Sequence, residues 1–163
     1  MTLRLLKYTN RHQGQKNAKN HETNQHIGTS RGGKTTKIHT AVDGLGNPLH
    51  FTLTSGNIND CIEAVNVLSY LPIEHSNIIA DKAYGTNKIR NYIVSQNASY
   101  TIPPKINAKN PWKFDNFLYK ERHLIECFFQ KMKNFRRIAT RYDKLASSFL
   151  TFIYLSAIEI ITR

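Results

Sequence analysis

Two alternating stretches joined by a short turn constrain the fold of this 163-residue chain more than any other feature. Apolar and polar residues alternate along 36–43 (TKIHTAVD) and again along 49–56 (LHFTLTSG), which is the period of a half-buried strand. The intervening GLGNP contains Gly46 and Asn47, which tolerate the positive φ of a tight turn. The pattern predicts an antiparallel hairpin.

The rest of the chain alternates helical and strand patterns. Helical spacing of Ile62, Val65 and Leu68 predicts a helix over 59–71, capped by Asn59 or Asp60. The elements expected after it are a strand at 77–81, a helix at 82–96, a strand at 99–104, a long helix from 118 and a final apolar helix at 146–163. This order predicts an α/β fold, a mixed sheet with helices on both faces.

The chain is strongly basic. Lys and Arg number 23 against 11 acids, giving a net charge of +12 and a pI near 9.9, while 40% of the residues are hydrophobic. A folded, basic chain points to a polyanionic partner, most often nucleic acid. An anionic membrane is the alternative, but it requires a basic amphipathic segment or a lipid signal, and the sequence shows neither.

Membrane insertion and secretion are not expected. The N-terminal MTLRLLKYTN lacks the apolar run of a signal peptide. The apolar segment 146–163 is shorter than the roughly 20 residues of a membrane span, and Glu159 interrupts it, so we expect a buried closing helix. Cys61 and Cys127 lack metal-type spacing, and we expect reduced, packed thiols in a cytoplasmic protein.

Residues 10–35 are polar, basic and without apolar periodicity, which predicts a flexible arm or loop. His12, His21 and His26 fall within it without a tight ligand pair, so we interpret them as exposed loop residues rather than metal ligands.

The long helix carries a polar stripe. At about 100° per residue, Tyr119, Arg122, Glu126 and Lys133 share an arc of roughly 60°. An apolar stripe lies beside it, formed by Ile125, Phe128 and Met132. A solvated face and a functional face explain the polar stripe equally well.

Two carboxylates favour a function. Asp81 closes the predicted strand 77–81, where open α/β sheets place their ligands, and Glu126 lies on the long helix. Asp81 alone could cap the following turn, and Glu126 alone could pair with Arg122 at i−4. Carboxylates in the groove of a basic protein would repel phosphate, so their presence there is explained when they hold cations. Mg²⁺ commonly uses one or two carboxylates, and paired ions promote phosphodiester chemistry.

These residues carry a family resemblance. Tyr, two residues, Arg, three residues, Glu, six residues, Lys is the pattern of the catalytic helix in DDE-superfamily transposases of bacterial insertion sequences, and 119–133 matches it without a gap. The segment IIADKAYG resembles the one bearing the second catalytic Asp. SRGGKTTKIHTAVDGLGNPLHF and ERHLIECFFQKMKNFRRIATRYDKLA are also similar, so the resemblance runs from about residue 27 to the end.

The resemblance implies a ribonuclease-H-like fold and a DNA transposase that mobilises an insertion sequence by metal-dependent phosphodiester cleavage and strand transfer. Asp81 and Glu126 are then the catalytic metal ligands, for Mg²⁺ or Mn²⁺ in its place. The implied DNA-contacting or supporting residues are Tyr119, Arg122, Lys133, Arg136 and Arg137, with Lys131 and Arg141 extending the basic track. Implied partners are duplex DNA at transposon ends and target, and a second copy or an intact transposase. Phe128 and Phe129 border the apolar stripe and are expected in the core.

The family's first catalytic Asp is not found in this chain. It belongs on the opening strand, but the equivalent MTLRLLKYTNRH contains no acid, and Asp43 belongs to the hairpin turn. We therefore expect a first strand that is poorly preserved or missing, a basic remnant and loop over 1–35, and a ribonuclease-H-like catalytic domain over 36–163.

The chain accordingly resembles the C-terminal part of a transposase, and a decayed copy and a second reading frame both fit. The alternative function is an inactive DNA-binding fragment that interferes with the intact transposase. A ribosomal type of RNA-binding protein explains the charge but not Asp81, Glu126 and the ordered motifs.

Overall fold

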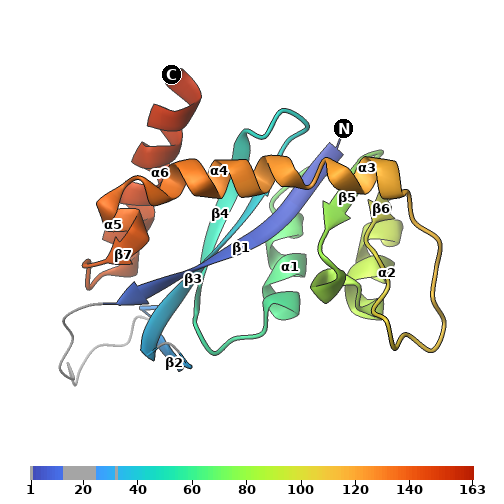
Figure 1. The fold of residues 1–163 in the computed structure, drawn as a ribbon, viewed down its shortest axis with the longest axis horizontal. Helices are drawn as coiled ribbons and strands as arrows, with labels where there is room; N and C mark the ends of the chain where they lie inside the picture. Colours follow the sequence, from blue (N-terminus) through green and yellow to red (C-terminus); the bar gives the residue numbers. More distant parts are fainter. Residues whose placement is uncertain (1, 13–24, 32) are drawn as a thin grey trace.

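One sheet organises the molecule (Figure 1). The computed structural model describes residues 2–12, 25–31 and 33–163. Its strands are β1 (Thr2–His12), β2 (Gly28–Ser30), β3 (Gly33–Val42), β4 (Pro48–Ser55), β5 (Asn77–Ala80), β6 (Ser99–Thr101) and β7 (Thr140–Arg141). The order is β2-β3-β1-β5-β6, with β4 also pairing with β3 and β7 with β1. The predicted mixed sheet is confirmed.

Strand β1 lies at the centre of this sheet. It pairs antiparallel with β3, where Leu5 faces Ala41, and parallel with β5, where Leu5 faces Ala80. Leu3 and Leu5 are buried, at 0% and 3% exposure. The expectation of a poorly preserved or missing first strand is therefore wrong: the strand is present and lacks only the acid. The domain boundary at residue 35 stays a prediction, and β1, β2 and the first residues of β3 lie before it.

The predicted hairpin is confirmed as β3 and β4. Gly46, in the connecting turn, has φ +92°, which a residue with a Cβ rarely adopts. Asp43 organises the same turn because its Oδ1 accepts hydrogen bonds from the backbone N–H groups of Leu45 (2.8 Å) and Asn47 (2.9 Å). The interpretation of Asp43 as a turn residue is confirmed.

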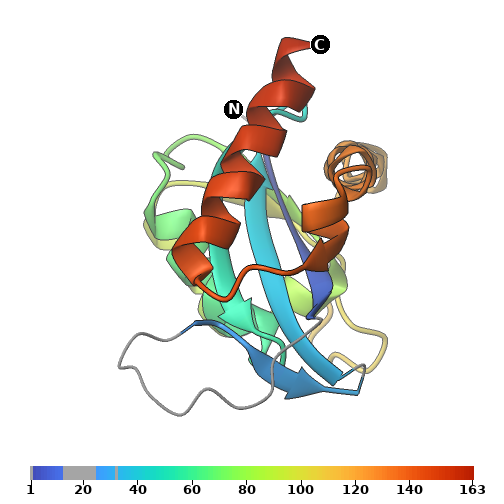
Figure 2. The same cartoon turned by 90° about the vertical axis from the view of Figure 1, so that its left-hand side faces the viewer.

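Each face of the sheet has its own apolar core. Helices α1 (Asp60–Ser69) and α2 (Asn87–Ser95) cover one face, above Leu3, Leu5 and Ile78. The other face carries α4 (His123–Lys133), α5 (Arg136–Ala139) and α6 (Ala146–Thr162), packed on β3 and β4. The C-terminal turns of α6 extend beyond the sheet in both views (Figure 2).

Two helical faces differ from the prediction. Asn59 caps α1 as expected, but the buried residues are Ala64, Val67 and Leu68, whereas Ile62 is 62% exposed. The closing helix α6 is buried only along one stripe. Its exposed apolar residues are Tyr154, Leu155, Ile158 and Ile161. Within the described residues, no helix is long and apolar enough to cross a membrane.

The predicted long helix is divided into α3 (Asn116–Lys120), α4 and α5. The short α3 precedes α4, and Glu121 and Arg122 join them through hydrogen bonds between residues three apart. The buried face of α4 is as predicted and includes Phe128 and Phe129. Cys127, on the opposite side, is exposed rather than packed. Cys61 is partly buried, and its thiol donates to the Ala83 carbonyl oxygen (2.8 Å).

Candidate active site

Asp81 follows directly after β5, at the carboxyl end of a strand paired with β1. Its Oδ1 accepts a hydrogen bond from the Lys82 backbone N–H (2.6 Å) and caps the short 3-10 helix η1 (Lys82–Tyr84). The cap engages one of the two carboxylate oxygens. Asp81 also lines an open cavity of about 450 Å³. The capping role and an accessible carboxylate are therefore compatible.

Glu126 is oriented by Arg122 at the joint between α3 and α4. Arg122 Nη1 lies 2.7 Å from Glu126 Oε1, one helical turn away. The Arg122 guanidinium carbon also lies 5.6 Å from the centre of the Tyr119 ring. Tyr119 belongs to α3, so the predicted single stripe comes from two helices. The three residues nevertheless meet, and the Glu126 side chain remains 46% exposed.

The Tyr119 phenol is affected by the charge of Asp81 as well as by Arg122 and Glu126. Partial burial raises the pKa of Tyr119, and the Asp81 and Glu126 carboxylates act in the same direction. Arg122 opposes them through its charge and a hydrogen bond to the phenol. Both carboxylates therefore lie within electrostatic range of one hydroxyl. The described contacts join Glu126 to Arg122 and Tyr119, and the charge of Asp81 reaches the same phenol.

The donor set suits one divalent cation. Asp81 and Glu126 offer hard oxygen donors, and Mg²⁺ often completes its shell with water and phosphate oxygens. The described residues contain no group of three or more His, Cys, Asp or Glu that could hold a metal ion. The position on β1 next in register to Asp81 is residue 6, a leucine. A two-ion site lacks a carboxylate at that position.

The expected basic track contains both exposed side chains and side chains that pack against the fold. Lys133 and Arg136 are exposed at the end of α4 and the start of α5. Arg137, although more than half exposed, packs over the Phe152 ring (4.2 Å) and lies 3.9 Å from the Asp143 carboxylate. These contacts direct Arg137 towards α6.

Arg141 does not extend the track. It has 0% exposure, and its guanidinium donates to four groups within the fold. The acceptors are the Asp143 carbonyl (2.9 Å), the Gln25 carbonyl (3.0 Å), the Thr36 hydroxyl (2.7 Å) and the Lys144 carbonyl (3.2 Å). The prediction of a DNA-contacting Arg141 is wrong because burial commits this cation to the fold.

Sequence reasoning missed the residues that share the cavity with Asp81. They are Asn59, Cys61, Lys82, Ala83, Lys105, Ile106 and Asn107. Lys105, Ile106 and Asn107 come from the loop after β6, distant in sequence from Asp81. The only signal was a lysine at every fourth position, 105, 109 and 113, in a segment without acids.

Known proteins resemble this chain over nearly all its length. A family model described as the transposase DDE domain matches residues 8–158. The chain belongs to this transposase family. A putative transposase for insertion sequence element IS6501 from Brucella ovis is 42% identical over 132 residues, covering 79% of this chain and 99% of the relative.

A solved piggyBac transposase, in a synaptic complex with hairpin DNA, superposes with a TM-score of 0.60 at 9% identity. The match covers 96% of this chain and 45% of the piggyBac chain, so this chain spans less than half of that structure. The likeness supports the ribonuclease-H-like transposase fold.

Family membership confirms the resemblance to insertion-sequence DDE transposases. The function class is DNA transposition, with DNA as the partner. Transposases of this class generally use divalent metal ions.

Proposed function

We propose that this chain is the catalytic domain of an insertion-sequence transposase in which Asp81 and Glu126 hold a divalent cation, Mg²⁺ or Mn²⁺ in its place. The supporting observation is the placement of the two carboxylates: Asp81 follows β5 and lines an open cavity, and Arg122 holds Glu126 next to the Tyr119 ring. Such an ion, when bound, activates a nucleophile and stabilises the leaving oxygen of a phosphodiester. The DNA ends of the element and its target supply that phosphodiester.

The protein residues have separate roles in this proposal. The β5 strand and the η1 cap fix Asp81, while Arg122 orients Glu126. The Tyr119 phenol, like that of any tyrosine, is protonated near neutral pH, so it can donate a hydrogen bond to a phosphate oxygen. Lys133 and Arg136 contact the DNA backbone from the exposed face of α4 and α5, and Arg137 adds a weaker contact.

A second function is favoured by the acid-free β1. Residues 2–12 contain no Asp or Glu, so the third carboxylate is missing from the strand that carries it in the family. Without it, the chain binds DNA and competes with an intact transposase for ends or subunits. Pairing with a second copy or with that intact enzyme, in the cytoplasm, belongs to the same proposal. The catalytic domain is taken as 36–163 together with β1.

The test is to place a carboxylate beside Asp81. We expect wild-type protein not to nick supercoiled DNA carrying the element's ends, and Leu6→Asp to nick it only with Mg²⁺ or Mn²⁺. Leu6→Asn is the control, because it adds polarity without charge. Adding Glu126→Gln to Leu6→Asp should abolish nicking, since Gln keeps the shape of Glu but not its charge.

Metal affinity supplies an independent readout. Calorimetric titration with Mn²⁺ should show tighter binding to Leu6→Asp than to Leu6→Asn, by at least about tenfold, because a further carboxylate joins the site. Equal affinities would remove position 6 from the proposed site. Strong metal-dependent nicking by the wild type would show that the chain is catalytically complete, and unimpaired nicking with Glu126→Gln would remove Glu126 from catalysis.

A further inference from the structure

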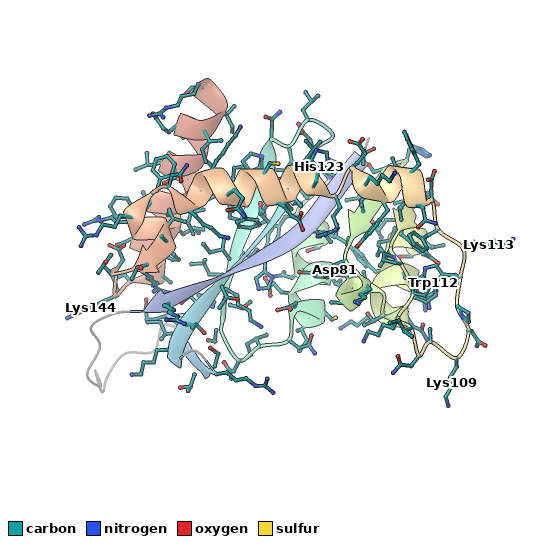
Figure 3. All side chains as sticks on the ribbon, viewed as in Figure 1. Asp81, Lys109, Trp112, Lys113, His123 and Lys144 are labelled. Atoms are coloured by element: carbon teal, nitrogen blue, oxygen red, sulfur yellow. The ribbon has the colours of Figure 1, made fainter. Side chains whose placement is uncertain are left out.

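The loop between β6 and α3, residues 103–115, has a distinctive charge pattern; we call it the lysine loop. Lys105, Lys109 and Lys113 are all exposed, and the first acid after β6 is Asp115, the N-cap of α3. The labelled Lys109 and Lys113 point outward from the end of the molecule that also holds Trp112, whereas Lys144 lies at the opposite end (Figure 3). The loop therefore presents three cations to solvent, and its one acid, Asp115, accepts hydrogen bonds from the backbone at the start of α3.

Trp112 anchors the base of the lysine loop. Its indole Nε1 donates to the Ile102 carbonyl oxygen (2.8 Å), and the Arg90 guanidinium stacks 3.8 Å from the ring centre. The Tyr100 ring packs edge-on at 6.4 Å. A Cβ at Gly85 would approach the indole to 3.2 Å, so this glycine permits the close packing. Trp112 is therefore committed to fixing the loop against β6 and α2.

The start of the loop forms a wall of the Asp81 cavity. Lys105, Ile106 and Asn107 line it together with Asp81 and Lys82. Ile106 is 95% exposed there, although burial of an isoleucine side chain away from water is favourable. Two cations and one apolar side chain thus surround the mouth of a cavity that contains a carboxylate.

We propose that the lysine loop is a second DNA-contacting element, which holds the phosphate backbone of the strand lying beside Asp81. Lys105, Lys109 and Lys113 contact successive phosphates, and Ile106 packs on a sugar or base at the cavity mouth. DNA fits better than a protein partner because the loop offers unpaired charge around one apolar residue rather than an apolar patch. The location of the reaction at Asp81 rests on the proposed function; the DNA contact itself does not.

Binding in EDTA tests the contact without any chemistry. The probe is a fluorescein-labelled duplex of arbitrary sequence, titrated at several salt concentrations. Each phosphate contact contributes about 0.9 to the slope of log affinity against log salt. We expect Lys105→Gln, Lys109→Gln and Lys113→Gln together to lower that slope by about 2 to 3. Lys144→Gln, a single exposed lysine far from the loop, should change it by less than about 0.5.

Trp112 provides a direct signal, because it is the only tryptophan in the sequence. DNA binding should change its emission in the wild type and in Lys144→Gln, and the change should disappear in the triple lysine variant. A photo-crosslinking residue at position 106 should attach to the duplex, whereas the same residue at position 45 should not. Leu45 is a matched site, since it is 82% exposed on the hairpin turn.

A slope unchanged in the triple variant, or an emission unaffected by DNA, would overturn the proposal. Equal crosslinking at 106 and 45 would also overturn it. If Leu6→Asp fails to nick DNA while the loop variants lose binding, the proposed chemistry fails and the DNA contact stands. Circular dichroism and thermal unfolding of each variant separate lost contact from lost folding.

Discussion

Arg122 and Arg141 lie in different surroundings. Arg122, at the joint between α3 and α4, is partly exposed and shares its charge with Glu126. In β7, which pairs with β1, Arg141 is buried and donates only within the fold. A net charge of +12 therefore overstates the cations available to DNA, because burial converts some of them into structural groups.

The largest expected effect is the loss of stability when the buried Arg141 is replaced. Arg141→Leu should lower the free energy of unfolding by about 3–5 kcal/mol, because the Thr36 hydroxyl and three backbone carbonyls lose a buried donor. Urea denaturation measures the change. Arg136→Ala, at an exposed position, is the control and should alter stability by less than about 0.5 kcal/mol. Similar losses in both variants would show that burial does not distinguish these cations.

The partly exposed Arg122 should behave in the opposite way. Arg122→Ala and Lys133→Ala should each weaken duplex binding by about three- to tenfold while changing stability by less than about 1 kcal/mol. We expect smaller losses from Lys16→Ala or Lys19→Ala, which lie outside the described residues in the predicted arm. Fluorescence anisotropy at fixed salt measures all four. Equal losses would show that total charge, not the α4 face, controls binding.

The salt dependence of DNA affinity also distinguishes exposed from buried arginines. Wild-type affinity for duplex DNA should fall steeply with rising salt, since neutralised phosphates release counterions. Arg141→Leu, measured at a temperature where it remains folded, should keep the wild-type slope. A filter-binding titration in which affinity is independent of salt would contradict an electrostatic interface.

The smallest effect concerns the titration of His50. His50 on β4 stacks on Tyr70 with ring centres 4.4 Å apart, and burial lowers the pKa of His50. The unfolded chain then binds a proton more readily below about pH 6.5, so stability falls as the pH falls through that value. His50→Phe preserves the stacking and should flatten this dependence between pH 7 and 5. The exposed His75 is the control, and an unchanged profile in His50→Phe would exclude His50 as the cause.

Local patterns predicted the elements that depend on local period. The β3–β4 hairpin, the Asn59 cap and the buried face of α4 follow from alternation, capping chemistry and helical spacing. Asp81 and Glu126 could be selected because each ends or faces an element in a recognisable way. Their shared electrostatic effect on Tyr119 depends on the tertiary fold.

The errors arose where long-range packing decides. The lack of an acid in β1 does not prevent this strand from forming, because its pairing with β3 and β5 holds it in the sheet. Burial of Arg141 depends on acceptors at Gln25 and Thr36, which no local pattern identifies. The break between α3 and α4 likewise leaves no proline or glycine in the sequence.

The lack of an acid in β1 affects the stability of the fold. A carboxylate next to Asp81 would repel it and lose hydration, and both effects oppose folding until a cation neutralises the pair. The strand as it stands avoids that cost while keeping its hydrogen bonds on both edges. The sequence of β1 therefore favours the stability of the fold over a third carboxylate beside Asp81.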